Sequence, residues 1–180
     1  MLPVPVLVRR ADALCIDALT GELAPGSTLR ALGGVVLPSE LGASGVARIV
    51  EAFQRWIAGY REHVELTHGY GTSRLRFTGP TPATRWASQL DALDAAARKA
   101  HGVAFASATP AQREQLVRTA LADIRLDRMP SIADAQHVAV ALLAYFYSSS
   151  EATDLCYQAR IGKERCRPLA QAPVNPQVSE

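Results

Sequence analysis

Residues 90–121 have the sequence LDALDAAARKAHGVAFASATPAQREQLVRTAL, which predicts two helices joined by a short turn. Apolar side chains recur at helical spacing and predict a first helix over about 84–100. His101-Gly102 suits its C-terminus, because glycine adopts the left-handed conformation without steric cost. Thr109, Pro110 and Gln112 then form the start of the next helix, as N-cap, first helical residue and third residue of a capping box. This pair of helices favours an all-α fold. The apolar stripe of the first helix comprises Trp86, Leu90, Leu93, Ala97 and Ala100.

Further helices are predicted on both sides of this pair. An amphipathic helix covers about 44–62, and another starts at Ser131 with Asp134 in its first turn. The second of these holds ten uncharged residues, 138–147, and a helix that is apolar all round is buried or faces a partner. A short helix over about 151–161 follows, which gives four to five helices in all. The apolar face of the 44–62 helix comprises Val46, Ile49, Val50, Phe53, Ile57 and Tyr60.

The remaining segments are predicted to be irregular, because glycine and proline interrupt them. Residues 20–45 and 63–83 are predicted loops. We expect one compact domain over the 180 residues. It has an irregular N-terminal segment (1–43), a helical core (44–167) and an extended tail (168–180).

Composition excludes several classes of protein. Hydrophobic residues make up 48% and the net charge is only +2, which argues against a disordered chain and against a dedicated nucleic-acid binder. No apolar stretch is long enough to cross a bilayer. The apolar start lies before Arg9-Arg10, the reverse of the order in a secretory signal, so we expect no export signal in the chain. Its compartment is unknown: cytoplasmic by default, or periplasmic if it is exported with a partner.

No catalytic, cofactor or metal motif is predicted. The sequence contains no GxGxxG, GxxxxGK[ST], CxxC, HExxH or GxSxG. The four histidines do not have the spacing of metal ligands, and we interpret them as unrelated surface or capping residues. The missing motifs favour a binding or subunit role. These histidines are His63, His68, His101 and His137.

Candidate partner-binding residues lie in the 63–83 loop and near the C-terminal helices. Aromatic and arginine side chains are enriched in protein interfaces, and long loops in compact domains are often functional. The alternatives are a plain surface loop, and a core position for at least one of the aromatic residues at 145–147. The candidates are Tyr70, Arg74, Arg76, Phe77, Tyr145, Tyr147, Tyr157 and Arg160.

Cys156 and Cys166 lie ten residues apart, on either side of a basic stretch. A helix followed by a returning loop brings such a pair within disulfide range, and closing this loop would stabilise the fold by roughly 2–3 kcal/mol. Two buried free thiols are the alternative in a reducing compartment.

The central stretch resembles the gluconate 2-dehydrogenase subunit 3 family. The family pattern is a helix ending in Leu-Asp-x-x-Ala-Arg, a loop around a glycine and a phenylalanine, and Ser/Thr-Pro-Ala-Gln opening the next helix. The resemblance extends over roughly 44–170, including the aromatic helix 142–147. The matching residues are Leu93, Asp94, Ala97, Phe105, Thr109, Pro110, Gln112 and Leu116.

This resemblance implies a non-catalytic small subunit that binds a large FAD-dependent dehydrogenase of the glucose–methanol–choline (GMC) type. Such a partner oxidises a sugar or alcohol and passes electrons to an acceptor such as a cytochrome c. The small subunit would support folding, flavin incorporation or export, and would hold no cofactor itself.

Many family members begin with a twin-arginine signal, and this sequence does not. Three explanations stay open: the partner carries the signal, the chain is shortened, or the complex is cytoplasmic. The alternative function is a free-standing helical enzyme or ligand-binding module, with a pocket between the apolar helix and the 63–83 loop.

Overall fold

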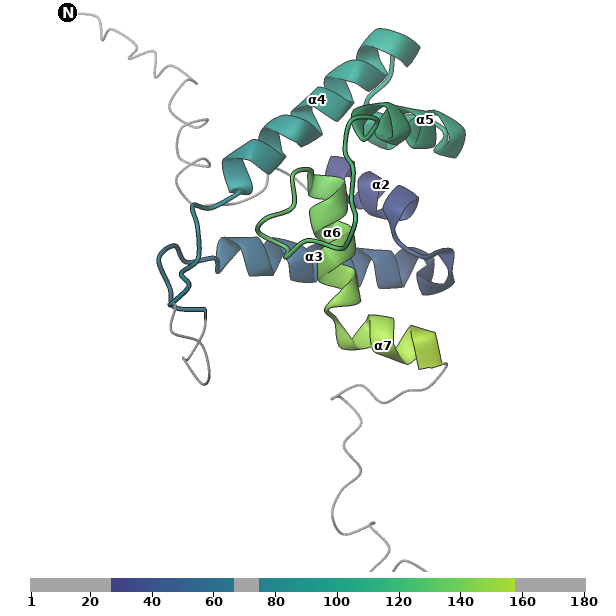
Figure 1. The fold of residues 1–180 in the computed structure, drawn as a ribbon. Coiled ribbons are helices and arrows are strands. Elements are labelled where there is room, and N and C mark those ends of the chain that lie inside the picture. The colour runs from purple at the N-terminus through teal and green to yellow at the C-terminus, as the bar shows by residue number, and fades with distance from the viewer. Residues whose placement is uncertain (1–26, 67–74, 158–180) are drawn as a thin grey trace, which may run out of the picture. The chain divides into compact units, whose positions relative to one another are not determined.

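The computed structural model describes residues 27–66 and 75–157, and within them the fold is all-α, as predicted (Figure 1). These residues form six α-helices rather than the expected four or five, with two short 3-10 helices and one isolated β-bridge. No helix among them has both the length and the apolar character needed to cross a membrane. The elements are α2 (Ser27–Val36), η1 (Ser39–Leu41), α3 (Gly42–Ala58), α4 (Ala83–His101), η2 (Phe105–Ser107), α5 (Pro110–Ala120), α6 (Val138–Tyr147) and α7 (Ser150–Tyr157).

The helix that the sequence did not predict is α2. The expected loop over 20–45, and with it the irregular N-terminal segment, is wrong from Ser27 onward. Gly33 was interpreted as a helix breaker, but it permits close packing of α2 on α3. A Cβ atom at Gly33 would lie 2.9 Å from a methyl carbon of Val50. Leu29 and Leu32 are fully buried on the same helix, and their burial outweighs the low helix propensity of glycine.

The core contains a cluster of aromatic rings. Phe53 of α3 lies 5.5 Å from Trp86 of α4 and 5.5 Å from Tyr145 of α6, measured between ring centroids. Trp56 stacks on Phe53 at 6.2 Å with an interplanar angle of 11°. Four of the chain's eleven aromatic residues therefore join three helices, although aromatics make up only 6% of the sequence. The predicted apolar face of α3 is buried at Val46, Ile49, Val50, Phe53 and Ile57.

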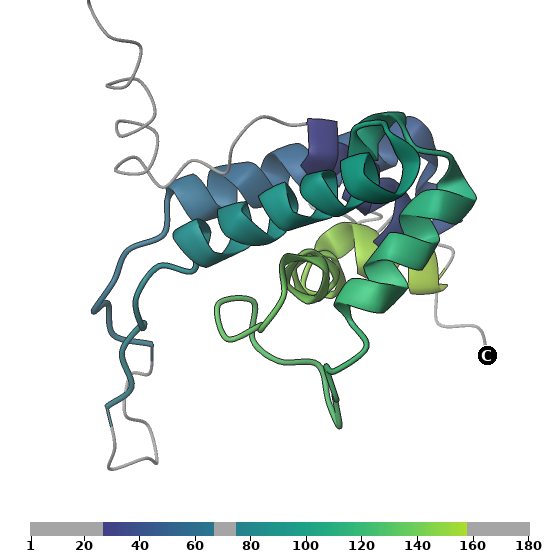
Figure 2. The same cartoon turned by 90° about the horizontal axis from the view of Figure 1, so that it is seen from above.

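The joint between α4 and α5 has the predicted geometry. Gly102 ends α4 in the left-handed conformation, with φ 72°. The Thr109 hydroxyl accepts a hydrogen bond from the backbone N–H of Gln112, and the Gln112 side chain accepts one from Thr109 N–H at 2.9 Å. Both views show α5 lying beside the end of α4 (Figure 2). The capping box and the glycine cap are therefore confirmed.

The apolar helix α6 begins at Val138 and not at Ser131. The Ser131 hydroxyl donates to the Asp134 carboxylate at 2.6 Å, and Asp134 N–H donates back to that hydroxyl at 3.3 Å. This pairing resembles a helix start, and the sequence prediction took it for one. The turn does not continue as a helix, so the predicted first-turn position of Asp134 is wrong.

Side chains from α4 explain the late start of α6. The Gln89 amide donates to the Gln136 carbonyl at 2.8 Å and accepts from Val138 N–H at 2.8 Å. The Ala135 carbonyl accepts from Arg85 at 2.9 Å. The backbone groups between the turn and α6 are thus bonded by another helix, and they need no helical partners of their own.

By the density of its internal contacts, the chain divides into two compact units between Tyr145 and Phe146. In the second unit, the Ser149 hydroxyl donates to the Phe146 carbonyl at 2.6 Å and accepts from Ala152 N–H at 3.3 Å. Ser149 thus caps α7, which corresponds to the short helix predicted over about 151–161. The prediction of a single domain over the whole chain stays a prediction, and the tail from residue 158 lies outside the described residues.

Candidate partner-binding surface

Two extended segments leave the ends of α3 and α4 and pair with each other; we call them the arms, residues 62–66 and 75–79. Leu66 N–H donates to the Arg76 carbonyl at 2.7 Å, and Thr78 N–H donates to the Val64 carbonyl at 2.8 Å. An antiparallel bridge joins Glu65 and Phe77. The predicted loop therefore contains a local ladder, in which side chains alternate between its two faces.

Thr78 fastens the base of the arms. Its hydroxyl donates to the Arg61 carbonyl at 2.7 Å and accepts from Val64 N–H at 2.8 Å. The Tyr60 hydroxyl donates to the Gly79 carbonyl at 3.0 Å. His63 lies between these contacts with φ 57°, a left-handed conformation that is uncommon for a non-glycine residue. The hydrogen bonds of Thr78 to Arg61 and Val64, on either side of His63 in the chain, hold this strained residue in place.

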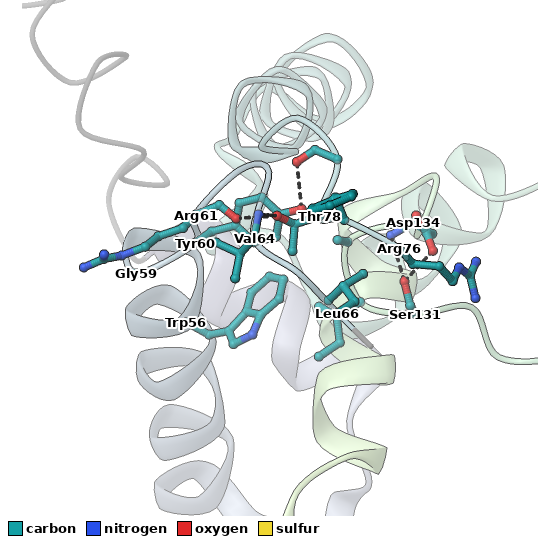
Figure 3. A pocket seen from close by; sticks show the side chains of 14 residues that line it. Trp56, Gly59, Tyr60, Arg61, Val64, Leu66, Arg76, Thr78, Ser131 and Asp134 are labelled. Atoms are coloured by element: carbon teal, nitrogen blue, oxygen red, sulfur yellow. Dashed lines mark hydrogen bonds between the residues drawn. The ribbon is translucent and has the colours of Figure 1, made fainter. Parts of the chain in front are cut away.

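A cavity of about 610 Å³ lies between the arms, the end of α3 and the turn before α6 (Figure 3). Trp56, Tyr60 and Phe77 give it aromatic walls, and Leu66 and Ile132 add aliphatic ones. This volume falls within the usual range for small-molecule binding pockets. The other lining residues are Gly59, Arg61, Val64, Arg76, Thr78, Gly79, Ser131, Ala133 and Asp134.

The arms expose four apolar side chains beside this cavity, Val64 and Leu66 on one face of the ladder and Leu75 and Phe77 on the other; we call these four residues together the arm patch. Their exposed fractions are 46%, 61%, 60% and 54%. Single exposed apolar residues are ordinary, but a group rimmed by charged residues is typical of an interaction site. The patch provides apolar area that a partner can remove from water.

The polar rim contains charges of both signs. Burial first, and then the nearby charges of Asp134 and Glu62, raise the pKa of Tyr60. The phenol therefore stays protonated at neutral pH and keeps its bond to Gly79. Arg76 also borders the cavity, as Figure 3 shows, so a partner meets a donor-rich arginine near an acidic turn. In the part of the chain that the structure describes, no three His, Cys, Asp or Glu side chains gather as metal ligands would.

Comparison with protein families gives a match to gluconate 2-dehydrogenase subunit 3 over residues 25–154. The chain belongs to this family. The match begins just before α2 and ends within α7, and the family name describes one subunit of a multi-subunit dehydrogenase. Neither the comparison with curated proteins nor that with solved structures gave a match.

The family motif of this subunit 3 member builds the α4–α5 joint. The Asp94 carboxylate accepts from Phe105 N–H at 2.9 Å and from Arg98 at 2.8 Å. These two bonds lower the pKa of Asp94, and the bond from the Phe105 backbone contributes more than the bond from Arg98. Phe105 is fully buried, so Asp94 satisfies a backbone donor beside an enclosed ring. The motif is therefore structural, and the arm patch lies outside it.

The structure brings two of the predicted interface residues, Arg76 and Phe77, to the cavity. Tyr145 is half-buried in the ring cluster, which agrees with the core alternative for one of the aromatic residues at 145–147. Tyr147 and Tyr157 are exposed at 55% and 74% in the second unit. The interface role of the predicted residues stays a prediction.

Cys156, the described member of the predicted disulfide, is exposed on α7. Tyr70, Arg74, Arg160 and Cys166 lie outside the described residues, so the disulfide also stays a prediction.

Sequence reasoning missed most of the cavity wall. Trp56 was not singled out, and Tyr60 was assigned only to the apolar face of a helix that in fact ends at Ala58. The alternation of Val64 with Leu66 and of Leu75 with Phe77 is the signal that the sequence offered, since period-two spacing indicates extended segments.

Proposed function

We propose that this chain is a non-catalytic small subunit that binds a large FAD-dependent dehydrogenase of the GMC type through the arm patch and its cavity. The observation that carries the proposal is the group of exposed apolar side chains, beside an aromatic cavity, in a member of a dehydrogenase subunit family. The flavin and the substrate site belong to the partner. A cytochrome c is the proposed electron acceptor of the complex.

The composition of the surface supports this docking mode. Complete burial of a leucine or phenylalanine side chain contributes about 1.5–3 kcal/mol, and Leu66 and Phe77 each still expose more than half of theirs. Tyrosine, tryptophan and arginine dominate the energy of central interface positions, and the cavity offers Tyr60, Trp56 and Arg76. An apolar side chain of the partner that enters the cavity would add buried area at the centre of the contact.

We further propose that binding supports folding, flavin incorporation or export of the large subunit. A large flavoprotein exposes apolar surface until it is assembled, and a small subunit that covers part of that surface lowers its tendency to aggregate. The complex would be periplasmic if the partner carries an export signal, and cytoplasmic otherwise.

Co-expression with the flavoprotein encoded by a neighbouring reading frame tests the proposal. We expect a yellow complex that co-purifies with the tagged small subunit, with less flavin in the large subunit when the small one is omitted. Phe77→Ala should weaken the complex without unfolding the subunit. Leu126→Ala is the matched control, because Leu126 is 49% exposed and does not line the cavity. The proposal is wrong if the chain is a stable monomer whose pull-downs never recover a flavoprotein.

A second candidate is a ligand-binding module, which the cavity of about 610 Å³ favours. It predicts that a small molecule stabilises the isolated chain. A thermal-shift screen of sugars, polyols and aromatic alcohols without a hit, together with recovery of the flavoprotein complex, would reject it.

A further inference from the structure

A second, separate cleft of about 310 Å³ lies between α4 and α5. Its walls are almost entirely apolar, and no charged side chain lines it. Three of its wall residues are alanines, Ala92, Ala96 and Ala120, whose short side chains leave the space between the helices open. The remaining lining residues are Gln89, Leu93, Leu116, Thr119 and His137.

His137 provides a hydrogen-bond donor to this cleft, whereas the Thr119 hydroxyl already donates to the Gln115 carbonyl at 2.9 Å. Its Nδ1 accepts from Ala139 N–H at 3.1 Å, as an N-cap acceptor for α6. Because Nδ1 is the acceptor, the neutral ring carries its proton on Nε2, which is therefore a donor. Nε2 has no hydrogen-bond partner among residues 27–66 and 75–157. The two polar ends of Gln89 are already bonded to Gln136 and Val138.

The position of this donor is unusual for a surface histidine. The residue is only 6% exposed, yet its Nε2 atom, which has no partner in the described chain, is not fully enclosed. His137 is also one of the residues that line the cleft. Burial lowers the pKa of His137, so the imidazole stays neutral at pH 7. An acceptor held in the cleft can therefore take the place of water at this donor, in a largely apolar setting where a hydrogen bond is stronger than in water.

We infer that the α4–α5 cleft binds a small, neutral, largely apolar molecule whose single carbonyl oxygen accepts a hydrogen bond from His137 Nε2. The alanine-lined walls require an apolar body, because they offer it no hydrogen bonds. The lining residues carry no charge to pair with a carboxylate or an amine, so the ligand is neutral. One donor fixes one acceptor, and the ligand is oriented with its carbonyl toward α6. This site shares no lining residue with the cavity beside the arm patch.

Acetophenone is the probe that tests this site, with ethylbenzene and benzoate as its matched controls. The full-length chain is labelled with ¹⁵N at histidine, and the His137 Nε2 resonance is followed by NMR during titration. We expect acetophenone to shift this resonance saturably and to bind about 2- to 10-fold more tightly than ethylbenzene, the share of one hydrogen bond. Benzoate should bind more weakly than acetophenone. Equal binding of ethylbenzene, tighter binding of benzoate, or no saturable shift would overturn the inference.

Two variants complete the test. Ala96→Leu fills the cleft without touching His137, and it should abolish binding; Ala95→Leu adds the same side chain at an exposed position outside the cleft and should leave binding unchanged. His137→Asn keeps an N-cap side chain but alters the donor, and it should remove the preference for acetophenone over ethylbenzene. Unchanged binding in the Ala96→Leu chain would show that the ligand lies elsewhere and would refute the site.

Discussion

Replacing Gln89 by alanine should destabilise the protein, because this one side chain holds the start of α6. Its two bonds are unequal in consequence. Val138 is fully buried, so without Gln89 its N–H loses its acceptor in a place that water does not reach. Gln136 is exposed, and its carbonyl can bond water instead. An unsatisfied buried donor costs about 1–3 kcal/mol, and we expect Gln89→Ala to lower the free energy of unfolding by that amount.

Urea denaturation followed by circular dichroism measures this change. The midpoint should fall while the slope stays constant, which indicates a change in stability alone. Gln89→Glu keeps an acceptor for Val138 near the N-terminus of α6, where a negative charge is favourable, and loses only the donor to the exposed Gln136 carbonyl, so it should cost less than Gln89→Ala. Gln115→Ala, at an exposed position of α5, is the matched control and should stay within about 0.5 kcal/mol of the wild type. If Gln89→Glu is as damaging as Gln89→Ala, the acceptor to Val138 is not the source of the stability.

Three further predictions concern packing and pH. Gly33→Ala should lower the free energy of unfolding in urea by about 1–3 kcal/mol, because its Cβ atom would press on α3. Gly34→Ala is the control: a Cβ atom there would meet no atom within 4 Å, so it should raise the free energy of unfolding by about 0.5–1 kcal/mol. Equal effects of the two substitutions would contradict the packing argument. Because the pKa of Asp94 is lower in the folded than in the unfolded chain, its carboxylate adds stability above pH 3.8, and this stability is lost as the pH falls through the pKa of the folded state. The difference in unfolding free energy between the wild type and Asp94→Asn should therefore shrink in acid titrations. A constant difference would contradict this role of Asp94. Because the pKa of His137 is lower in the folded chain, the unfolded chain gains a proton first as the pH falls, so stability should decrease as the pH drops through 6.5. Denaturation compared at about pH 7.5 and about pH 5.5 measures this decrease, and His137→Asn should lack it.

Periodicity predicted the helices whose bonding and burial are local. The bounds of α4 follow from apolar spacing and its glycine cap, and the start of α5 follows from the capping box at Thr109, which needs only four adjacent residues; α3 is present as predicted but ends at Ala58 rather than near residue 62. The prediction failed at α2, because Gly33 suits both a turn and a close helix contact, and only the position of Val50 decides between them. It failed again before α6, where bonds from Gln89, 47 and 49 residues away, replace helical ones.

The candidate site was harder to predict than the fold for the same reason. Arg76 and Phe77 could be chosen by residue type, since arginine and aromatic residues are enriched in interfaces. The cavity needs Trp56 from a helix end, Leu66 from an arm and Ile132 from a turn, and no spacing in the sequence relates them. The ladder between the arms extends over only a few residues, too short for its period to be recognised with certainty.

Folding and binding use different residues in this chain, and this separation gives the docking proposal its sharpest consequence. The family motif acts at Asp94 and Thr109, where it caps α5 and the turn before it. Leu66 and Phe77 expose more than half of their side chains, so removing them costs the isolated fold little buried area. Substitutions in the arm patch are therefore free to change the affinity for a partner at nearly constant stability, while substitutions in the motif lower both together. Parallel loss of stability and affinity on mutation of Phe77 would mean that the arms belong to the fold and not to an interface.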